Sequence, residues 1–144
     1  MSQLDPNCRL QVDNLEVCLA ETGERLINGV SFSIKAGEIF ALVGESGSGK
    51  SVTSLAVMRL LPDALAITGG RVRMQGVELF DVTEQAMQGI RGRRAAMIFQ
   101  NALTSLNPVQ RVGDQVAETL RLHTELRGSA LRERVVELFG EVGI

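Results

Sequence analysis

The fold of this chain is decided by one stretch, Gly44-Glu45-Ser46-Gly47-Ser48-Gly49-Lys50-Ser51, which matches the pattern G-x-x-x-x-G-K-[ST] in full. Its glycines at 44, 47 and 49 permit backbone conformations and approach distances that a Cβ atom would block. Successive backbone N–H groups can therefore form a concave anion site at the positive N-terminal end of a following helix. The pattern predicts that residues 44–51 bind a polyphosphate.

Two side chains of this loop carry further chemistry. Lys50 supplies a positive charge for the β- and γ-phosphates of a nucleotide, and the Ser51 hydroxyl is suited to bind Mg²⁺. The chain has one other lysine, Lys35. The alternative is a flexible Gly/Ser loop with an unrelated lysine. The flanking sequence disfavours that alternative, because a strand-like apolar run ends at Val43 and helical spacing begins at Ser51.

The flanks of the loop predict buried strands and a helix. Residues 39–43 are apolar on both faces, which is typical of a strand in a parallel sheet with helices on either side. Residues 52–61 have helical spacing and end before Pro62. Residues 95–99 form a second wholly apolar run that ends at Gln100. We expect both apolar runs to be buried strands.

Other segments alternate apolar and polar residues, which predicts strands with one wet face, as in an antiparallel sheet. Leu10 and Val12 alternate with the opposite parity to the residues after them, so Asp13-Asn14 should hold a bulge or turn. A strand is also expected to open at Gly69-Gly70. The alternating apolar positions are Leu15, Val17 and Leu19, then Val30, Phe32 and Ile34, then Val72 and Met74.

Helical patterns occupy the second half of the chain. Asp81, with Glu84 three residues on, resembles a capping box for a short helix that ends near Ile90. Two amphipathic helices are predicted after Pro108, the second with Ser129 as its N-cap. Their apolar stripes are Val112, Val116 and Leu120, and Leu131, Val135, Leu138 and Val142.

Composition limits the classes of function. With 144 residues, 44% apolar and 22% charged, the chain is an ordinary globular domain in size and make-up. A net charge of −2 argues against a general nucleic-acid binder. Cys8 and Cys18 lack metal-site spacing and are expected to be reduced thiols. The N-terminus has no signal-peptide pattern, and no apolar run approaches the ~20 residues that span a bilayer.

Short strings outside the loop narrow the class further. The GTPase elements DxxG and NKxD do not occur in the 144 residues. The informative strings are Gly29-Val30-Ser31-Phe32-Ser33-Ile34, Ala36-Gly37-Glu38, Gly69-Gly70-Arg71-Val72, Met97-Ile98-Phe99-Gln100 and Thr104-Ser105-Leu106-Asn107-Pro108. Together with the loop at 44–51, these strings make the chain resemble the ATP-binding subunit of an ABC transporter. The Ser-Leu-Asn-Pro string is similar to the dipeptide/oligopeptide importer branch, and the resemblance extends from Leu10 to Ile144.

The resemblance implies an α/β fold, a P-loop NTPase of the ABC ATPase type. Residues 1–9 would be a tail, and residues 10–38 an antiparallel β-subdomain. Residues 39–100 would hold part of a RecA-like core, from the P-loop through the Q-loop, and residues 101–144 the start of a helical subdomain. The implied cofactors are ATP and Mg²⁺, held by the loop at 44–51.

The resemblance also implies roles for two residues outside the loop. Gln100 would be the Q-loop glutamine, reaching the Mg²⁺ and the attacking water; the plainer interpretation is a polar strand end. It is followed by Asn101-Ala102, where the family usually has an acidic residue and a proline. Leu19 falls where the family stacks an aromatic ring on adenine. The chain has no Trp or Tyr, so an aliphatic contact would replace the stacking.

The family implies partners and a location for the full protein. It would energise import of peptides or similar small solutes by ATP hydrolysis, at the cytoplasmic face of the inner membrane. Transmembrane permease subunits, a second ATP-binding subunit and, indirectly, a solute-binding protein would be its partners. The 144 residues contain no LSGGQ signature and no Walker B strand, so this chain alone is expected to bind Mg·ATP weakly and not to hydrolyse it. Two alternatives stay open: a non-catalytic truncated module that docks on a transporter subunit, and another P-loop ATPase.

Overall fold

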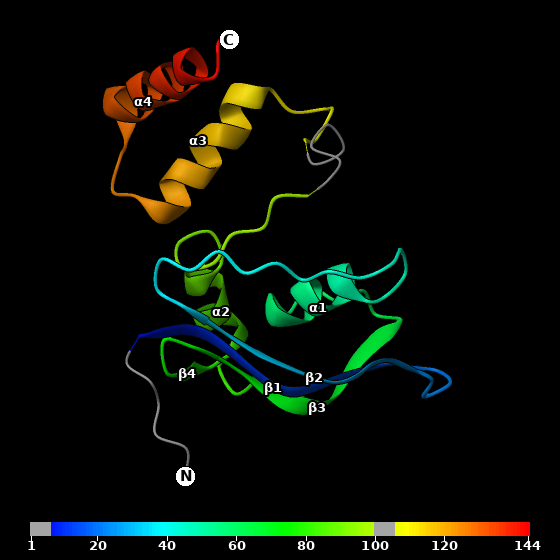
Figure 1. Ribbon diagram of the computed structural model, residues 1–144. Coiled ribbons are helices and arrows are strands. Elements are labelled where there is room, and N and C mark those ends of the chain that lie inside the picture. Colours follow the sequence, from blue (N-terminus) through cyan, green and yellow to red (C-terminus); the bar gives the residue numbers. More distant parts are fainter. Residues whose placement is uncertain (1–6, 100–105) are drawn as a thin grey trace. The chain divides into compact units, whose positions relative to one another are not determined.

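A computed structural model describes residues 7–99 and 106–144 of the chain (Figure 1). The chain divides into two compact units, Met1–Gln88 and Gly89–Ile144. Within the described residues, none of the helices combines the length and apolarity that a membrane crossing requires.

The first unit is built on a four-stranded antiparallel sheet in the order β2-β1-β3-β4. Its strands are β1 (Cys8–Leu19), β2 (Arg25–Lys35), β3 (Leu65–Met74) and β4 (Val77–Glu78). The antiparallel arrangement predicted from the alternating segments is therefore confirmed. The strand β3 begins at Leu65, earlier than the expected start at Gly69-Gly70. The sheet thus draws on residues on both sides of the predicted boundary at residue 38.

The predicted irregularity at Asp13-Asn14 is confirmed as a shift in register along β1. The register shifts between Val12 and Leu15 against β2, and between Asp13 and Glu16 against β3. Asn14 has a positive φ of 48°, and its amide donates to Ser31 Oγ at 2.7 Å. On the β3 side the partner is Gly70, where an added Cβ would collide with the Asn14 carbonyl. A left-handed glycine therefore allows β3 to pass the bulge closely.

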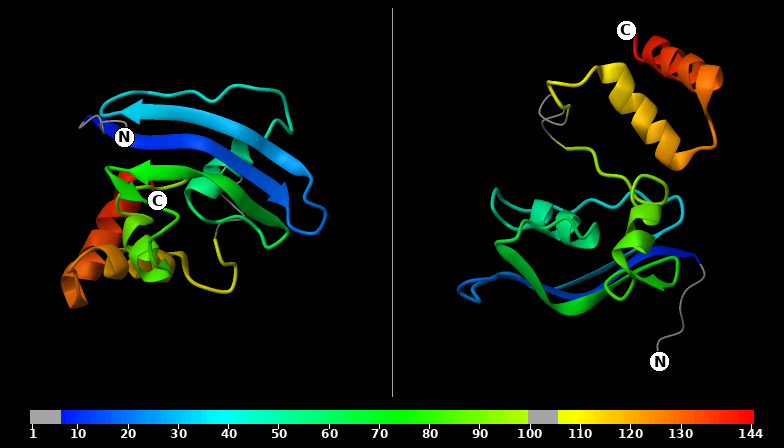
Figure 2. Two further views of the ribbon diagram at one scale, coloured as in Figure 1. Left: turned by 90° about the horizontal axis from the view of Figure 1, so that it is seen from below. Right: turned by 180° about the vertical axis from the view of Figure 1, so that it is seen from behind.

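Two helices, α1 (Lys50–Val57) and α2 (Glu84–Ile90), lie over the same face of the sheet (Figures 1 and 2). Helix α1 ends at Val57, short of the predicted residue 61, because Arg59 adopts a left-handed conformation with φ 52°. The Arg59 Nη1 atom then donates to the carbonyls of Leu79 at 3.2 Å and Val82 at 2.7 Å. Buried core residues of this unit include Val12, Leu15, Val17, Ala56, Val72 and Met87.

The capping box predicted from Asp81 and Glu84 is wrong. Helix α2 begins at Glu84, and the amide of Ala86 donates to Thr83 Oγ1 at 3.3 Å. Thr83 immediately precedes the helix and its hydroxyl reaches the first turn, whereas Asp81 lies too far back along the chain. Asp81 is exposed instead.

The second unit contains the two predicted amphipathic helices, α3 (Val112–His123) and α4 (Gly128–Glu141). Ala117, Leu131 and Val135 form its buried core, flanked by Val116, Leu120, Leu126 and Phe139. The prediction of Ser129 as N-cap is wrong: α4 already begins at Gly128, and Arg127 precedes it without a side-chain cap. Val142 lies beyond the helix and is exposed. On the outer face, Arg134 donates to Glu137 and Glu141, both at 2.9 Å, which raises the pKa of its guanidinium.

The two wholly apolar runs are not buried strands, so that prediction is wrong. Residues 39–43 form no strand, with Ile39 98% and Val43 88% exposed. Residues 95–99 make only one isolated parallel bridge, between Arg91 and Ala95, and Ile98 is 95% exposed. A fully buried parallel strand needs strands beside it and helices on both faces. Within residues 7–99 and 106–144 every strand pair is antiparallel, so neither run has such neighbours.

Candidate nucleotide-binding site

The loop at 44–51 follows residues 39–43, which form no strand, and leads directly into α1, which begins at Lys50. Gly49 is the N-cap residue of α1, with φ 88° in the left-handed region and no side-chain cap. The first amides of an α-helix have no acceptor within the helix. Here no side chain of the loop occupies the cap, so these donors and the positive end of the helix dipole face the loop.

The Lys50 side chain folds back over the loop. Its Nζ atom donates to the carbonyl oxygens of Gly44 at 2.8 Å and Glu45 at 2.6 Å, and to Ser48 Oγ at 3.2 Å. These contacts fix the ammonium group above the loop. These contacts use all three N–H donors of the ammonium, so a polyphosphate bound in the loop would meet a positive charge close by and would replace at least one of the loop contacts.

Three glycines shape the loop. Gly47 and Gly49 have φ values of 82° and 88°, which residues with a Cβ rarely adopt. At Gly44 an added Cβ would lie 2.5 Å from Ser48 Oγ, closer than such atoms approach. At Gly49 it would collide with Ile27 Cδ1 of β2. The backbone conformation therefore favours glycine at positions 47 and 49, as the sequence pattern predicted, whereas at Gly44 the nearest atom belongs to the rotatable Ser48 hydroxyl.

Two residues on α1 hold its first turn. The buried Thr53 donates through Oγ1 to the Gly49 carbonyl at 3.0 Å, and its amide donates to the same oxygen at 2.8 Å. Ser51 lies in the first turn and is exposed, so its hydroxyl is open to a ligand. A hard oxygen donor of this kind suits Mg²⁺, and Ser51 is the residue that would hold the ion beside the phosphates. Bound Mg²⁺ would neutralise part of the phosphate charge.

Two predicted site residues are not joined to the loop by any described contact. Gln100 lies outside the described residues. Leu19 is half-buried at the end of β1, where its amide donates to Glu24 at 2.8 Å and it pairs with Leu65 of β3. The roles of Gln100 toward Mg²⁺ and of Leu19 toward adenine stay predictions.

Sequence reasoning missed Ile27 and Thr53 as parts of the site. In the sequence, nothing distinguishes Ile27 from the other apolar residues of β2. Its contact with Gly49 depends on how the loop lies against the sheet. The role of Thr53 could have been predicted, because a threonine three residues after the loop lysine lies on the first turn of the predicted helix. There its hydroxyl can donate to a backbone carbonyl one turn earlier.

The sequence and fold together define a class, the P-loop nucleotide-binding proteins. Residues 27–144 match the ABC transporter family model, and the chain belongs to this family.

Curated relatives agree with the resemblance to peptide-importer subunits. A probable peptide ABC transporter ATP-binding protein from Sinorhizobium fredii is 44% identical over 86% of this chain and 37% of its own length. The dipeptide transport ATP-binding protein DppD of Bacillus subtilis is 44% identical over 94% of this chain and 41% of its own. The oligopeptide transport ATP-binding protein OppD of the same organism is 42% identical over 94% of this chain and 38% of its own length. The chain thus spans about two fifths of the length of these relatives.

A solved structure shares the fold. The ATP-binding cassette MJ0796, in a dimeric post-hydrolysis state bound to ADP and phosphate, matches with a TM-score of 0.71 and 23% identity. The match covers 91% of this chain and 56% of that chain. The predicted fold class, an ABC-type P-loop NTPase, is confirmed in partial form.

Proposed function

We propose that this chain binds Mg·ATP through residues 44–51, as part of the ATP-binding subunit of an ABC importer for peptides or similar small solutes. The observation that carries the proposal is the Lys50 ammonium, fixed by the Gly44 and Glu45 carbonyls at the uncapped N-terminus of α1. A lysine charge, free helix amides and the positive end of a helix dipole then act on the same anion.

The finer parts of the proposal rest on the relatives. Their printed names assign dipeptide and oligopeptide transport, which supports a peptide-like solute for the full protein. The solved cassette is a dimer, which supports pairing with a second ATP-binding subunit. In this proposal the full protein binds permease subunits at the cytoplasmic face of the inner membrane. Through them it is linked indirectly to a solute-binding protein.

The direct test is a titration of the chain with a fluorescent ATP analogue in the presence of Mg²⁺. The variant Lys50→Ala removes the fixed charge, and Lys35→Ala is its matched control because Lys35 is the only other lysine. Loss of hydrogen bonds from a charged group costs about 1.5–3 kcal/mol, so Lys50→Ala should bind about 10- to 150-fold more weakly. Lys35→Ala should bind as the unmodified chain does.

The competing function, a module that docks on a transporter subunit without nucleotide, gives a different result in the same titration. It predicts equal and negligible binding by the unmodified chain, Lys50→Ala and Lys35→Ala. That outcome would overturn the proposal.

A further inference from the structure

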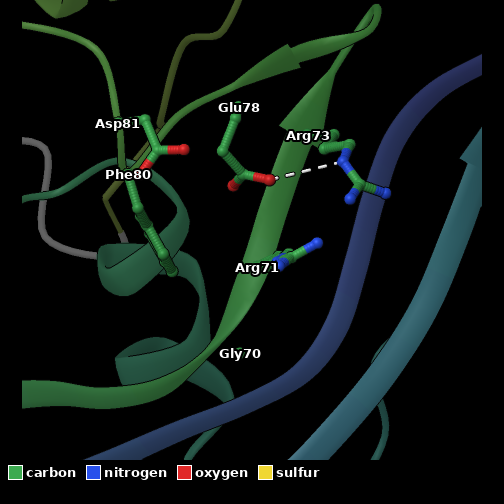
Figure 3. A pocket seen from close by; sticks show the side chains of 6 residues that line it. All are labelled: Gly70, Arg71, Arg73, Glu78, Phe80 and Asp81. Carbon is green, nitrogen blue, oxygen red and sulfur yellow. Dashed lines mark ion pairs between the residues drawn. The ribbon is translucent and has the colours of Figure 1, made fainter.

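A second hollow of the first unit lies on the β3–β4 side of the sheet, apart from the residues of the nucleotide loop. It has a volume of about 430 Å³ and is lined by Gly70, Arg71, Arg73, Glu78, Phe80 and Asp81 (Figure 3). This volume is within the range of small-molecule sites. Its charged side chains include both cations and anions, so their pairing decides what the hollow can bind.

Arg73 and Glu78 neutralise each other within this lining. Arg73 Nε lies 3.3 Å from Glu78 Oε2 (Figure 3). The Arg73 Nη1 atom lies 3.5 Å from Asp13 Oδ2 on β1. Glu78 Oε1 also accepts the amide of Val72 at 3.0 Å. Both side chains are mostly buried and hold each other in place. They therefore line the hollow as an ion pair and are not available to bind a charged ligand.

Arg71 and Asp81 are different, because the described part of the chain gives neither side chain an ion pair or a hydrogen bond. Arg71 lies on the polar face of β3, next to the buried Val72. Asp81 does not cap helix α2, because the Thr83 hydroxyl accepts the hydrogen bond from its first turn. The hollow therefore presents one cation and one anion, Arg71 and Asp81, that make no ion pair within the described residues. Arg71 lies opposite Asp13 of β1 in the strand register, but the Asp13 carboxylate contacts Arg73 instead.

The hollow also offers apolar surface. Phe80 and Gly70 line a neighbouring cavity of about 360 Å³ as well, together with Arg59, Ile67 and Gly69. Phe80 thus borders both cavities. An apolar group of a ligand could lie along Phe80 and Ile67 while its charged groups stay in the first cavity.

We infer that this hollow binds a small zwitterion, a short peptide with free termini and an apolar side chain. Its carboxylate would contact Arg71, its ammonium group Asp81, and its side chain Phe80. The inference goes beyond the proposed function, because no residue of the nucleotide loop takes part. Both charged groups are exposed, so binding is weak and falls as salt is raised.

The test uses the 144-residue chain, uniformly labelled with ¹⁵N, and the dipeptide Ala-Phe as the probe. Saturable amide shifts are expected at residues 69–81. Exposed ion pairs contribute about 0.2–1 kcal/mol, so Arg71→Gln and Asp81→Asn should each weaken binding by up to about fivefold. N-acetyl and C-terminal amide forms of the peptide should lose a similar factor. Arg9→Gln and Asp63→Asn, which alter exposed charges outside the hollow, should have no effect.

Two results would overturn the inference: no saturable shifts at residues 69–81, or equal binding of the blocked and free peptides. Equal binding by Arg71→Gln, Asp81→Asn and the unmodified chain would do the same. Titrating the same samples with Mg·ATP separates this inference from the proposed function. A failure at the hollow leaves nucleotide binding intact, whereas a failure at residues 44–51 leaves the peptide shifts intact.

Discussion

Gly49 of the phosphate-binding loop packs against Ile27 of β2 so closely that a Cβ on Gly49 would collide with Ile27 Cδ1. Ile27 is buried in the sheet, while Gly49 is the N-cap of α1. This contact anchors the start of α1, and with it the Lys50 side chain, to the antiparallel sheet. The position of the loop is therefore set by a strand residue, Ile27, that precedes Gly49 by 22 residues in the sequence.

Gly49→Ala should destabilise the chain more than Gly47→Ala does. Both residues have φ above 80°, so each substitution incurs the left-handed penalty of about 1–2 kcal/mol. At Gly47 nothing lies within 4 Å of an added Cβ, whereas at Gly49 the Cβ must displace Ile27. Urea unfolding of the two variants measures the difference. Equal losses of unfolding free energy would show that the Ile27 contact does not constrain the loop.

Arg59→Met should loosen the segment that follows α1. Arg59 donates to the carbonyls of Leu79 and Val82, and its Nη2 atom lies 3.8 Å from Glu84 Oε2. Methionine keeps the aliphatic stem but removes these charged donors, at a cost of about 1.5–3 kcal/mol. Thermal unfolding followed by circular dichroism checks the loss. Arg9→Met, at an exposed position on β1, is the control and should leave the midpoint nearly unchanged.

Val43→Thr should change the stability of the 144-residue chain by no more than about 0.5 kcal/mol, because Val43 is 88% exposed. Leu15→Ala, in the buried core of the sheet, should cost about 2–5 kcal/mol. Denaturant unfolding of both variants makes the comparison. A large loss for Val43→Thr would mean that residues 39–43 are buried as a strand in solution after all.

The 144-residue chain should bind Mg·ATP without turning it over. Its sequence contains no LSGGQ string and no Walker B strand, and we therefore expect no carboxylate in the 144 residues to activate the attacking water. A phosphate-release assay at saturating Mg·ATP should stay at the background rate. Steady-state activity that disappears in Lys50→Ala would contradict this prediction.

Features with a local cause could be predicted from the sequence. Alternation located β1 and β2, and the parity change at Asp13-Asn14 located the bulge that Gly70 accommodates. The loop at 44–51 was predicted with its glycines and Lys50, because the pattern itself encodes the backbone conformation. The Thr83 cap was missed because Asp81 and Glu84 have the same spacing as a capping box.

Features that depend on neighbours could not be predicted. Residues 39–43 and 95–99 have the composition of buried strands, but composition does not supply the strands that must lie beside them. Ile39 and Ile98 are consequently exposed. The contact of Gly49 with Ile27 likewise depends on how the loop crosses the sheet, and no spacing in the sequence reports it.

The most direct test of the account is the amide spectrum of the ¹⁵N-labelled chain during titration with Mg·ATP. If the uncapped start of α1 and the Lys50 ammonium hold the phosphates, the largest shifts should fall on Gly47, Gly49, Lys50 and Ser51. In Lys50→Ala, about 10- to 150-fold more nucleotide should be needed to produce them. Shifts confined to other residues, or the same shifts in Lys50→Ala at the same nucleotide concentration, would contradict the claim that this loop binds the nucleotide.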